Sequence, residues 1–258
     1  MANSRSWEKI FFDCGADTHD FDSGDPFPVS AQQIKESCQD FKKTAEKEVR
    51  VLCMQATRES RPDIFKERKL FLLPVKNGFY NLVKGEGYLD IPEIESGIEI
   101  YRSSLSFILE SSLVGNSEMQ HLDFAYASSL IRTFIGDDSL VLTIRGRKYT
   151  PKFSFRVGKA KIDVESVQTE VDAGYEGADK IVLFEAKNSK TTNTIIRQLY
   201  YPFRQWSLAT SKEIFTVFFE KRGEVFHLWQ YGFEDESDYN SHRLIRSHKY
   251  KIDSFESD

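Results

Sequence analysis

Residues 180–187 read KIVLFEAK, an apolar run that contains one acid and ends on one base. Consecutive apolar residues from Ile181 to Phe184, followed by an alanine, predict a buried strand with two apolar faces. Such a strand lies in the middle of its sheet, because both of its faces must be covered. Alternation of side chains then places Glu185 and Lys187 on one face. An acid and a base at the centre of a sheet need a physical reason.

A buried carboxylate at Glu185 costs several kcal/mol unless it is paired or bound to a cation. Lys187 is one possible partner. Asp172, thirteen positions earlier, ends the strand predicted over 163–172, and the turn at 173–179 can bring it beside Glu185. Two adjacent carboxylates repel each other, which raises one pKa unless a metal neutralises them. Oxygen ligands without a nearby His or Cys favour Mg²⁺ or Mn²⁺ over zinc.

The spacing Asp172…Glu185-Ala186-Lys187 resembles the motif of the PD-(D/E)XK nuclease superfamily, and in particular its type II restriction endonucleases. The similar segments are SEMQHLDFAYAS (117–128), VDAGYEGADKIVLFEAKN (171–188) and RQLYYPFRQW (197–206). Val171 stands where the superfamily's name has proline. The resemblance implies an α/β (α+β) fold with a restriction-endonuclease-like core, in which helices flank a mixed central sheet.

The resemblance also implies Mg²⁺-dependent, sequence-specific hydrolysis of phosphodiester bonds in double-stranded DNA, with Mn²⁺ able to substitute. Asp172, Glu185 and the backbone carbonyl of Ala186 are the implied metal ligands. Lys187 is implied to orient or deprotonate the attacking water and to offset the developing negative charge. The alternative is a buried Glu185–Lys187 pair beside an Asp172 that only begins a turn.

Three further polar residues are candidates for the same site. Glu170 shares a strand face with Asp172, so it is either an additional metal ligand or a solvated charge. Glu118 opens a predicted helix on the face of its apolar residues, so it either reaches the metal or interacts with the helix dipole. Gln198 departs from the apolar stripe of its helix, so it either reaches the site or a DNA phosphate, or is simply exposed.

Between Ser139 and Ile162 the chain has seven basic residues and no acid, with aromatic residues interleaved: Arg145, Arg147, Lys148, Lys152, Arg156, Lys159 and Lys161. In a chain of net charge −5, this block predicts binding to a polyanion. Arg145 and Arg147 are the candidates for contact with bases. A second cluster, RESRPDIFKERK (58–69), is diluted by acids and predicts either phosphate contacts or a surface loop.

Two domains are predicted, an N-terminal DNA-recognition or accessory module (1–110) and a nuclease domain (111–258). The module contains a helix over 30–43, with Ser30 and Gln33 forming a capping box, and a hairpin around Asn77-Gly78, which suggests a winged-helix-like unit. The second domain contains helices over 118–135 and 191–209, strands over 139–146, 152–158, 163–172, 180–187, 213–220 and 224–233, and a polar, peripheral tail from 234. Ser117 and Gln120 predict a second capping box.

The 258-residue chain has no run of eighteen apolar residues and no signal-peptide pattern, which predicts a cytoplasmic protein without a membrane span. Its three cysteines form no metal-ligand or disulfide pattern. We expect a symmetric homodimer, because cutting both strands of a palindrome requires two related sites, and a companion DNA methyltransferase is possible. The alternatives are a structure-specific nuclease, such as a junction resolvase or repair nuclease, and an inactive DNA-binding protein on the same fold.

Overall fold

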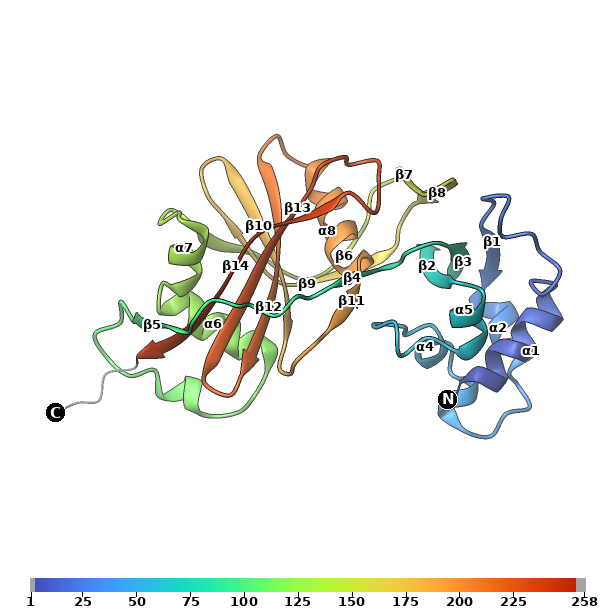
Figure 1. The fold of residues 1–258 in the computed structure, drawn as a ribbon, viewed down its shortest axis with the longest axis horizontal. Helices are drawn as coiled ribbons and strands as arrows, with labels where there is room; N and C mark the ends of the chain where they lie inside the picture. The colour runs from blue at the N-terminus through green and yellow to red at the C-terminus, as the bar shows by residue number, and fades with distance from the viewer. Residues whose placement is uncertain (1–2, 254–258) are drawn as a thin grey trace.

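A seven-stranded mixed sheet forms the larger part of the molecule, and the computed structural model describes residues 3–253 (Figure 1). In spatial order its strands are β5 (Glu99–Arg102), β14 (His242–Asp253), β13 (Val225–Phe233), β12 (Glu213–Arg222), β10 (Lys180–Lys187), β9 (Gln168–Glu176) and β6 (Val141–Tyr149). Strand β10 pairs in parallel with β12 and antiparallel with β9. The predicted central position of 180–187 is therefore confirmed.

Helices cover both faces of this sheet (Figure 1). On one face, Ile181 and Leu183 of β10 belong to the core that includes helix α8 (Arg197–Ser207). On the other face, Val182 and Phe184 pack with helices α6 (Glu118–Ala127) and α7 (Leu130–Ile135). The alternation predicted from the sequence is thus present, and the fold is an α+β architecture with a large mixed sheet between helices.

The N-terminal unit, residues 4–84, has its own core and lies beside the end of the large sheet (Figure 1). Its helices are α1 (Ser4–Cys14), α2 (Ala31–Ser37), α3 (Thr44–Lys47), α4 (Val49–Leu52) and α5 (Asp63–Glu67), and its three-stranded sheet contains β1 (Phe27–Ser30), β3 (Phe79–Lys84) and β2 (Leu70–Lys76). The predicted β2–β3 hairpin is confirmed, as is the capping box of Ser30 and Gln33. The helix ends at Ser37, short of residue 43.

Two short two-stranded ladders connect the N-terminal unit with the rest of the chain. Strand β4 (Tyr88–Asp90) pairs with β11 (Asn193–Ile195), directly before α8. Strand β7 (Phe153–Val157) pairs with β8 (Ala160–Val164), and this hairpin contacts the N-terminal unit where the Glu165 amide donates to the Val75 carbonyl at 3.0 Å. The strand predicted over 163–172 was placed wrongly: its first two residues belong to β8, and the strand that contains Asp172 is β9, which begins at Gln168 and continues to Glu176. Asp172 therefore lies inside a strand, and the turn predicted over 173–179 is shortened to 177–179.

The helix predicted over 118–135 is divided in two. Ser129 has a φ of 65°, a left-handed conformation that ends α6, and α7 begins at the next residue. The capping box at its start is incomplete, since the Ser117 hydroxyl accepts from the Gln120 amide but the Gln120 side chain donates to the carbonyls of Ser111 and Val114. That side chain therefore fixes the segment before the helix, which includes the 3₁₀ turn η1 (Glu110–Leu113).

The helix predicted over 191–209 begins only at Arg197. Residues 193–195 form β11, because Thr194 and Ile195 are β-branched and an available partner, β4, satisfies their backbone groups. From Ile196 onward the predicted apolar stripe is confirmed: Ile196, Leu199, Tyr200 and Phe203 are buried. The partly buried Trp206 packs against the same core.

The tail predicted as peripheral was placed wrongly. Residues 242–253 form β14, which lies inside the large sheet between β13 and β5. Tyr250 and Ile252 are buried in the core beneath α6 and α7, while Leu244 and Ile245 remain exposed. Between residues 3 and 253, no helix is long and apolar enough to cross a membrane. All three cysteines are free.

Candidate active site

Glu185 lies near the end of β10 and is 8% exposed, beneath the start of α8. Its Oε1 atom accepts from the Lys187 ammonium at 2.5 Å and from the Gln198 amide at 2.5 Å. The Lys187 ammonium also donates to the Ala186 carbonyl at 2.9 Å. The acid and the base of the strand therefore contact each other, as their shared face allows, and the remaining oxygen of Glu185 has no hydrogen bond among the described residues.

Asp172 lies across the ladder, at a bulge in β9. Ile144 of β6 pairs with Gly174 and Gly146 pairs with Val171, so β9 has one more residue than β6 in this interval. Gly146, at a φ of 82°, accommodates the irregularity opposite. Bulges turn side chains out of their regular alternation. Here the Asp172 carboxylate accepts from the Ala186 amide at 2.8 Å, which brings it to the end of β10 that carries Glu185.

The two carboxyl groups are held in an environment that disfavours their charge. Burial raises the pKa of Glu185 to about 7, against the attraction of Lys187, and the nearby Asp172 and Glu118 carboxylates raise it further. Burial also raises the pKa of Asp172, although the Ala186 amide and Lys187 oppose it. For Lys187, burial opposes the charge but Glu185 outweighs it, so its pKa is raised. The cluster therefore combines two carboxyl groups whose charge is disfavoured by burial with one ammonium whose charge is favoured by Glu185.

A polar cleft of about 420 Å³ opens over these residues. The cleft is lined by the predicted site residues Asp172, Glu185 and Lys187, together with Glu118, Glu170, Arg197 and Gln198. Glu118 is half-buried at the first turn of α6, while Glu170 is exposed and forms an ion pair with Arg147 at 3.1 Å. All four acids proposed as site residues from the sequence therefore line this cleft.

The donor atoms available at this site are oxygens, the ligand type that Mg²⁺ takes. In residues 3–253, no three His, Cys, Asp or Glu side chains come together as a preformed metal cage. Mg²⁺ commonly binds through one or two carboxylates and keeps several waters or substrate phosphates. Asp172, Glu185 and the Ala186 carbonyl form an all-oxygen donor set of this kind, and the Lys187 ammonium shows that a positive charge is accommodated there.

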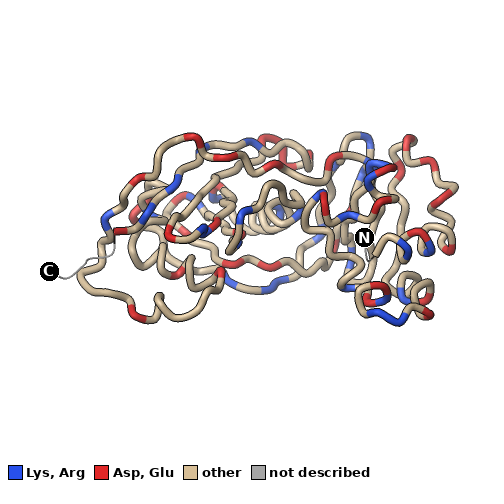
Figure 2. The backbone as a smooth tube through the Cα atoms, turned by 60° about the horizontal axis from the view of Figure 1, so that its bottom comes forward, with Lys and Arg blue, Asp and Glu red and all other residues tan. Residues whose placement is uncertain are grey.

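The predicted basic block is exposed throughout, but its members differ in their contacts. Three arginines have acidic partners: Arg145 pairs with Asp123, Arg147 with Glu170, and Arg156 with Asp235. Lys148 lies over the Trp206 ring at 5.7 Å, and Lys152, Lys159 and Lys161 have no ion pair within the described part of the chain. Figure 2 accordingly shows acidic and basic residues interspersed along the backbone.

Sequence reasoning missed several residues that complete the site. Thr194 donates its hydroxyl to the Gln198 side-chain oxygen at 2.8 Å. Arg197 lines the cleft, and its Nε is a buried donor without a partner in the described structure. Asp123, on α6, forms an ion pair with Arg145, whose charge acts on Asp172. Arg197 and Gln198 were adjacent polar residues beside an apolar stripe, which is a usable signal; Thr194 lay in a segment predicted to be helical.

The fold and the site define an α+β protein whose buried acidic cluster lies at the end of a central strand. The chain belongs to the family described as Domain of unknown function (DUF6997), which matches residues 83–251. Residues 4–82 match a second family, described as Domain of unknown function (DUF6996). The boundary between the two matches falls within β3. Comparison with curated proteins and with solved structures found no significant match.

Proposed function

We propose that this protein is a Mg²⁺-dependent endonuclease that hydrolyses phosphodiester bonds in double-stranded DNA at specific sequences, as type II restriction endonucleases do. The observation that carries the proposal is the convergence of Asp172, Glu185 and Lys187 at the end of a central strand, in an open polar cleft. The restriction-endonuclease-like character of the core is part of the same proposal. Mn²⁺ is expected to replace Mg²⁺.

In this proposal each residue has a distinct role. Asp172, Glu185 and the Ala186 carbonyl would hold the cation, which supplies charge stabilisation for the scissile phosphate when bound. Lys187, whose ammonium lies against Glu185 and the Ala186 carbonyl, would orient the attacking water and face the phosphate. Gln198, which donates to one oxygen of Glu185, would keep that oxygen in place.

Digestion of a long duplex DNA in the presence of Mg²⁺ tests the proposal directly. Discrete fragments on a gel are the expected result. Cleavage confined to branched DNA would instead identify a structure-specific nuclease of the same superfamily. DNA that stays intact with both Mg²⁺ and Mn²⁺, but is still bound, would identify an inactive DNA-binding protein; the intact Asp172–Glu185–Lys187 cluster argues against that outcome.

We expect Lys152 and Lys161 to contact DNA phosphates. Both are exposed, lack acidic partners among the described residues, and line a cleft of about 770 Å³ with Lys76 of the N-terminal unit. The double variant Lys152→Ala/Lys161→Ala is expected to weaken binding equally for all sequences and to lower the salt-dependence slope by about 2. Turnover at saturating DNA should stay unchanged. Titrations at several salt concentrations measure this, with Lys42→Ala/Lys43→Ala, two exposed lysines of the N-terminal unit, as the control.

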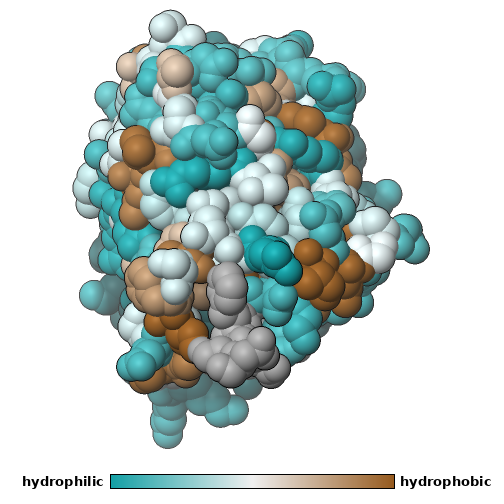
Figure 3. Space-filling model, turned by 90° about the vertical axis from the view of Figure 1, so that its left-hand side faces the viewer, coloured by the Kyte–Doolittle hydropathy of each residue, from teal (hydrophilic) through white to brown (hydrophobic). Residues whose placement is uncertain are grey.

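The protein is proposed to act as a homodimer, and the end of the molecule that carries β5 and η1 is the proposed interface. Six of the 17 exposed large apolar side chains in the described residues lie in this short stretch: Ile98, Ile100, Phe107, Ile108, Leu113 and Val114. Figure 3, a view of this end, shows brown apolar patches on its surface. Exposed apolar patches mark interaction sites, and a second copy provides the second catalytic site that double-strand cleavage needs.

Replacing Leu113 and Val114 by aspartate is expected to convert a dimer to a monomer. Both side chains are 74% exposed, so the charges should not disturb the core of the protomer. Light scattering after gel filtration measures the mass. Phe12→Asp, at a position 75% exposed on α1, is the matched control and should remain dimeric. A wild-type protein that is monomeric at all accessible concentrations would contradict the assignment.

A further inference from the structure

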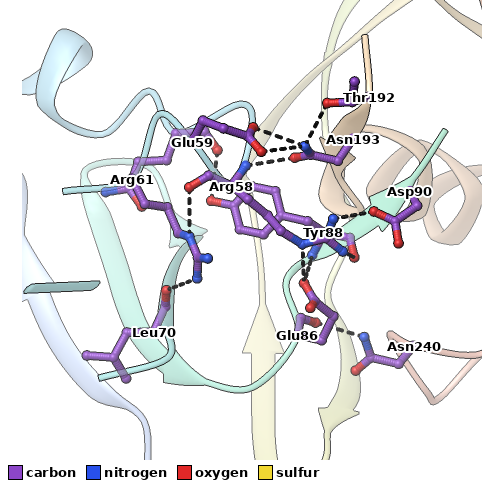
Figure 4. Close-up of polar contacts among 11 residues, drawn as sticks. Arg58, Glu59, Arg61, Leu70, Glu86, Tyr88, Asp90, Thr192, Asn193 and Asn240 are labelled. Atoms are coloured by element: carbon purple, nitrogen blue, oxygen red, sulfur yellow. Dashed lines mark hydrogen bonds and ion pairs between the residues drawn. The ribbon is translucent and has the colours of Figure 1, made fainter. Parts of the chain in front are cut away.

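Hydrogen bonds join the N-terminal unit to β11, and backbone atoms of both segments take part in them (Figure 4). The Ile195 amide donates to the Ala56 carbonyl at 2.9 Å, and the Arg58 amide donates to the Asn193 side-chain oxygen at 2.7 Å. The Asn193 amide group donates to both oxygens of Glu59, at 3.1 and 3.0 Å. Asn193 is 3% exposed, and its amide group also donates to the Thr192 hydroxyl at 3.2 Å.

The partner strand of β11 is held by the same segment. The Arg58 guanidinium contacts the Asp90 carboxylate, donates to the Tyr88 carbonyl at 3.1 Å and lies 3.4 Å from the Glu86 carboxylate (Figure 4). Arg58 belongs to the second basic cluster of the sequence, and these contacts commit it to the protein rather than to DNA. The segment 56–59 therefore fixes both strands of the β4–β11 ladder.

From β11 the contacts continue to the candidate active site. Thr194 donates its hydroxyl to the Gln198 side-chain oxygen at 2.8 Å, and an amide whose oxygen is engaged in this way must direct its NH₂ group elsewhere. That NH₂ group donates to Glu185 at 2.5 Å. The position of β11 thus determines both the location and the orientation of the amide that holds the buried carboxylate.

We propose that Asn193 is a positioning residue, through which the N-terminal unit fixes β11, Gln198 and so the geometry of Glu185. The proposal rests on the proposed function, because it treats Glu185 as a ligand of the catalytic cation. In this proposal the N-terminal unit helps to position the active site, in addition to any role in DNA recognition. If DNA binding displaced segment 56–59, the contacts through β11 and Gln198 would transmit that displacement to Glu185.

A donor–acceptor exchange at the Asn193–Glu59 contact tests this role. Asn193→Asp places a carboxylate against Glu59 and repels it, while the new carboxylate can still accept from the Arg58 amide. Glu59→Gln keeps an acceptor for Asn193, so it should behave like the wild type. In the double variant Asn193→Asp/Glu59→Gln, the new amide at position 59 can donate to the new carboxylate at position 193, which restores the contact with its direction reversed.

We expect Asn193→Asp to lower kcat about tenfold and to weaken Mn²⁺ binding, with KM for duplex DNA changed by less than about twofold. The double variant should recover most of both losses. Isothermal titration of Mn²⁺ alone and steady-state cleavage provide the two measurements. Asn240→Ala removes a 2.8 Å bond to the Glu86 carbonyl in the same junction but outside the chain to Gln198, so it should leave kcat unchanged.

The result that would overturn the proposal is an Asn193→Asp variant with normal kcat and Mn²⁺ affinity, or a double variant no better than the single one. A wild-type protein that neither cuts DNA nor binds Mn²⁺ would refute the proposed function instead. In that case, amide hydrogen exchange in the cation-free protein tests separately whether the Asn193–Glu59 contact fixes residues 193–198. Exchange over 193–198 should rise in Asn193→Asp and return in the double variant; unchanged exchange would refute the link.

Discussion

Replacing Asp172 by asparagine is expected to abolish DNA cleavage, with a loss of at least about a thousandfold in kcat. The substitution removes one of the two carboxylates available to the cation but keeps the shape of the side chain. An asparagine oxygen can still accept from the Ala186 amide, so the bulge in β9 should persist. Binding to duplex DNA should be retained, because the proposed phosphate contacts lie on other elements.

Stability provides an independent check of the same substitution. Burial raises the pKa of Asp172, which means that the folded protein disfavours its charge. A neutral asparagine relieves that cost, so the melting temperature without cation should be equal to that of the wild type or higher. Mg²⁺ or Mn²⁺ should stabilise the wild type but not the variant. Asp179→Asn, at an exposed acid in the β9–β10 turn, is the control and should cut normally.

Near-normal turnover by Asp172→Asn would mean that the cation site lies elsewhere. A variant that is inactive and also unfolded would leave cleavage uninformative, and the melting curve identifies that case. The metal-dependent shift in melting temperature then carries the test in the folded protein. A shift of equal size in both proteins would remove Asp172 from the ligand set.

The centre of the fold was predictable because its signal is local. An apolar run on both faces identified β10, and alternation alone placed Glu185 and Lys187 together. Pairing of the two strands was predicted correctly, but Asp172 lies inside β9 and not at its end, and the bulge that directs its side chain toward Ala186 was not predicted. A bulge depends on the register between β9 and β6, which are separated by the whole β7–β8 hairpin, and no short pattern encodes that register.

The incorrect predictions concern segments whose structure depends on pairing with strands that are distant in the sequence. Residues 242–253 read as a polar tail because only Tyr250 and Ile252 are well buried among its apolar residues, yet β13 and β5 supply the hydrogen-bonding edges that make it a strand. Residues 193–195 form a strand only because β4 lies alongside. This second error hid Asn193 and Thr194, and with them the contact route from the N-terminal unit to the site.

Replacing Lys187 by alanine is the second change with a large expected effect, a loss of about a hundredfold to ten-thousandfold in kcat. The ammonium is the only basic group that contacts Glu185 in the described residues, and its loss removes the group proposed to orient water and offset charge. DNA binding should remain close to that of the wild type. Lys187→Met, which keeps the apolar stem, should be equally inactive if charge rather than packing matters. Single-turnover cleavage at saturating DNA measures the chemical step, and activity of Lys187→Met near that of the wild type would assign Lys187 a packing role only.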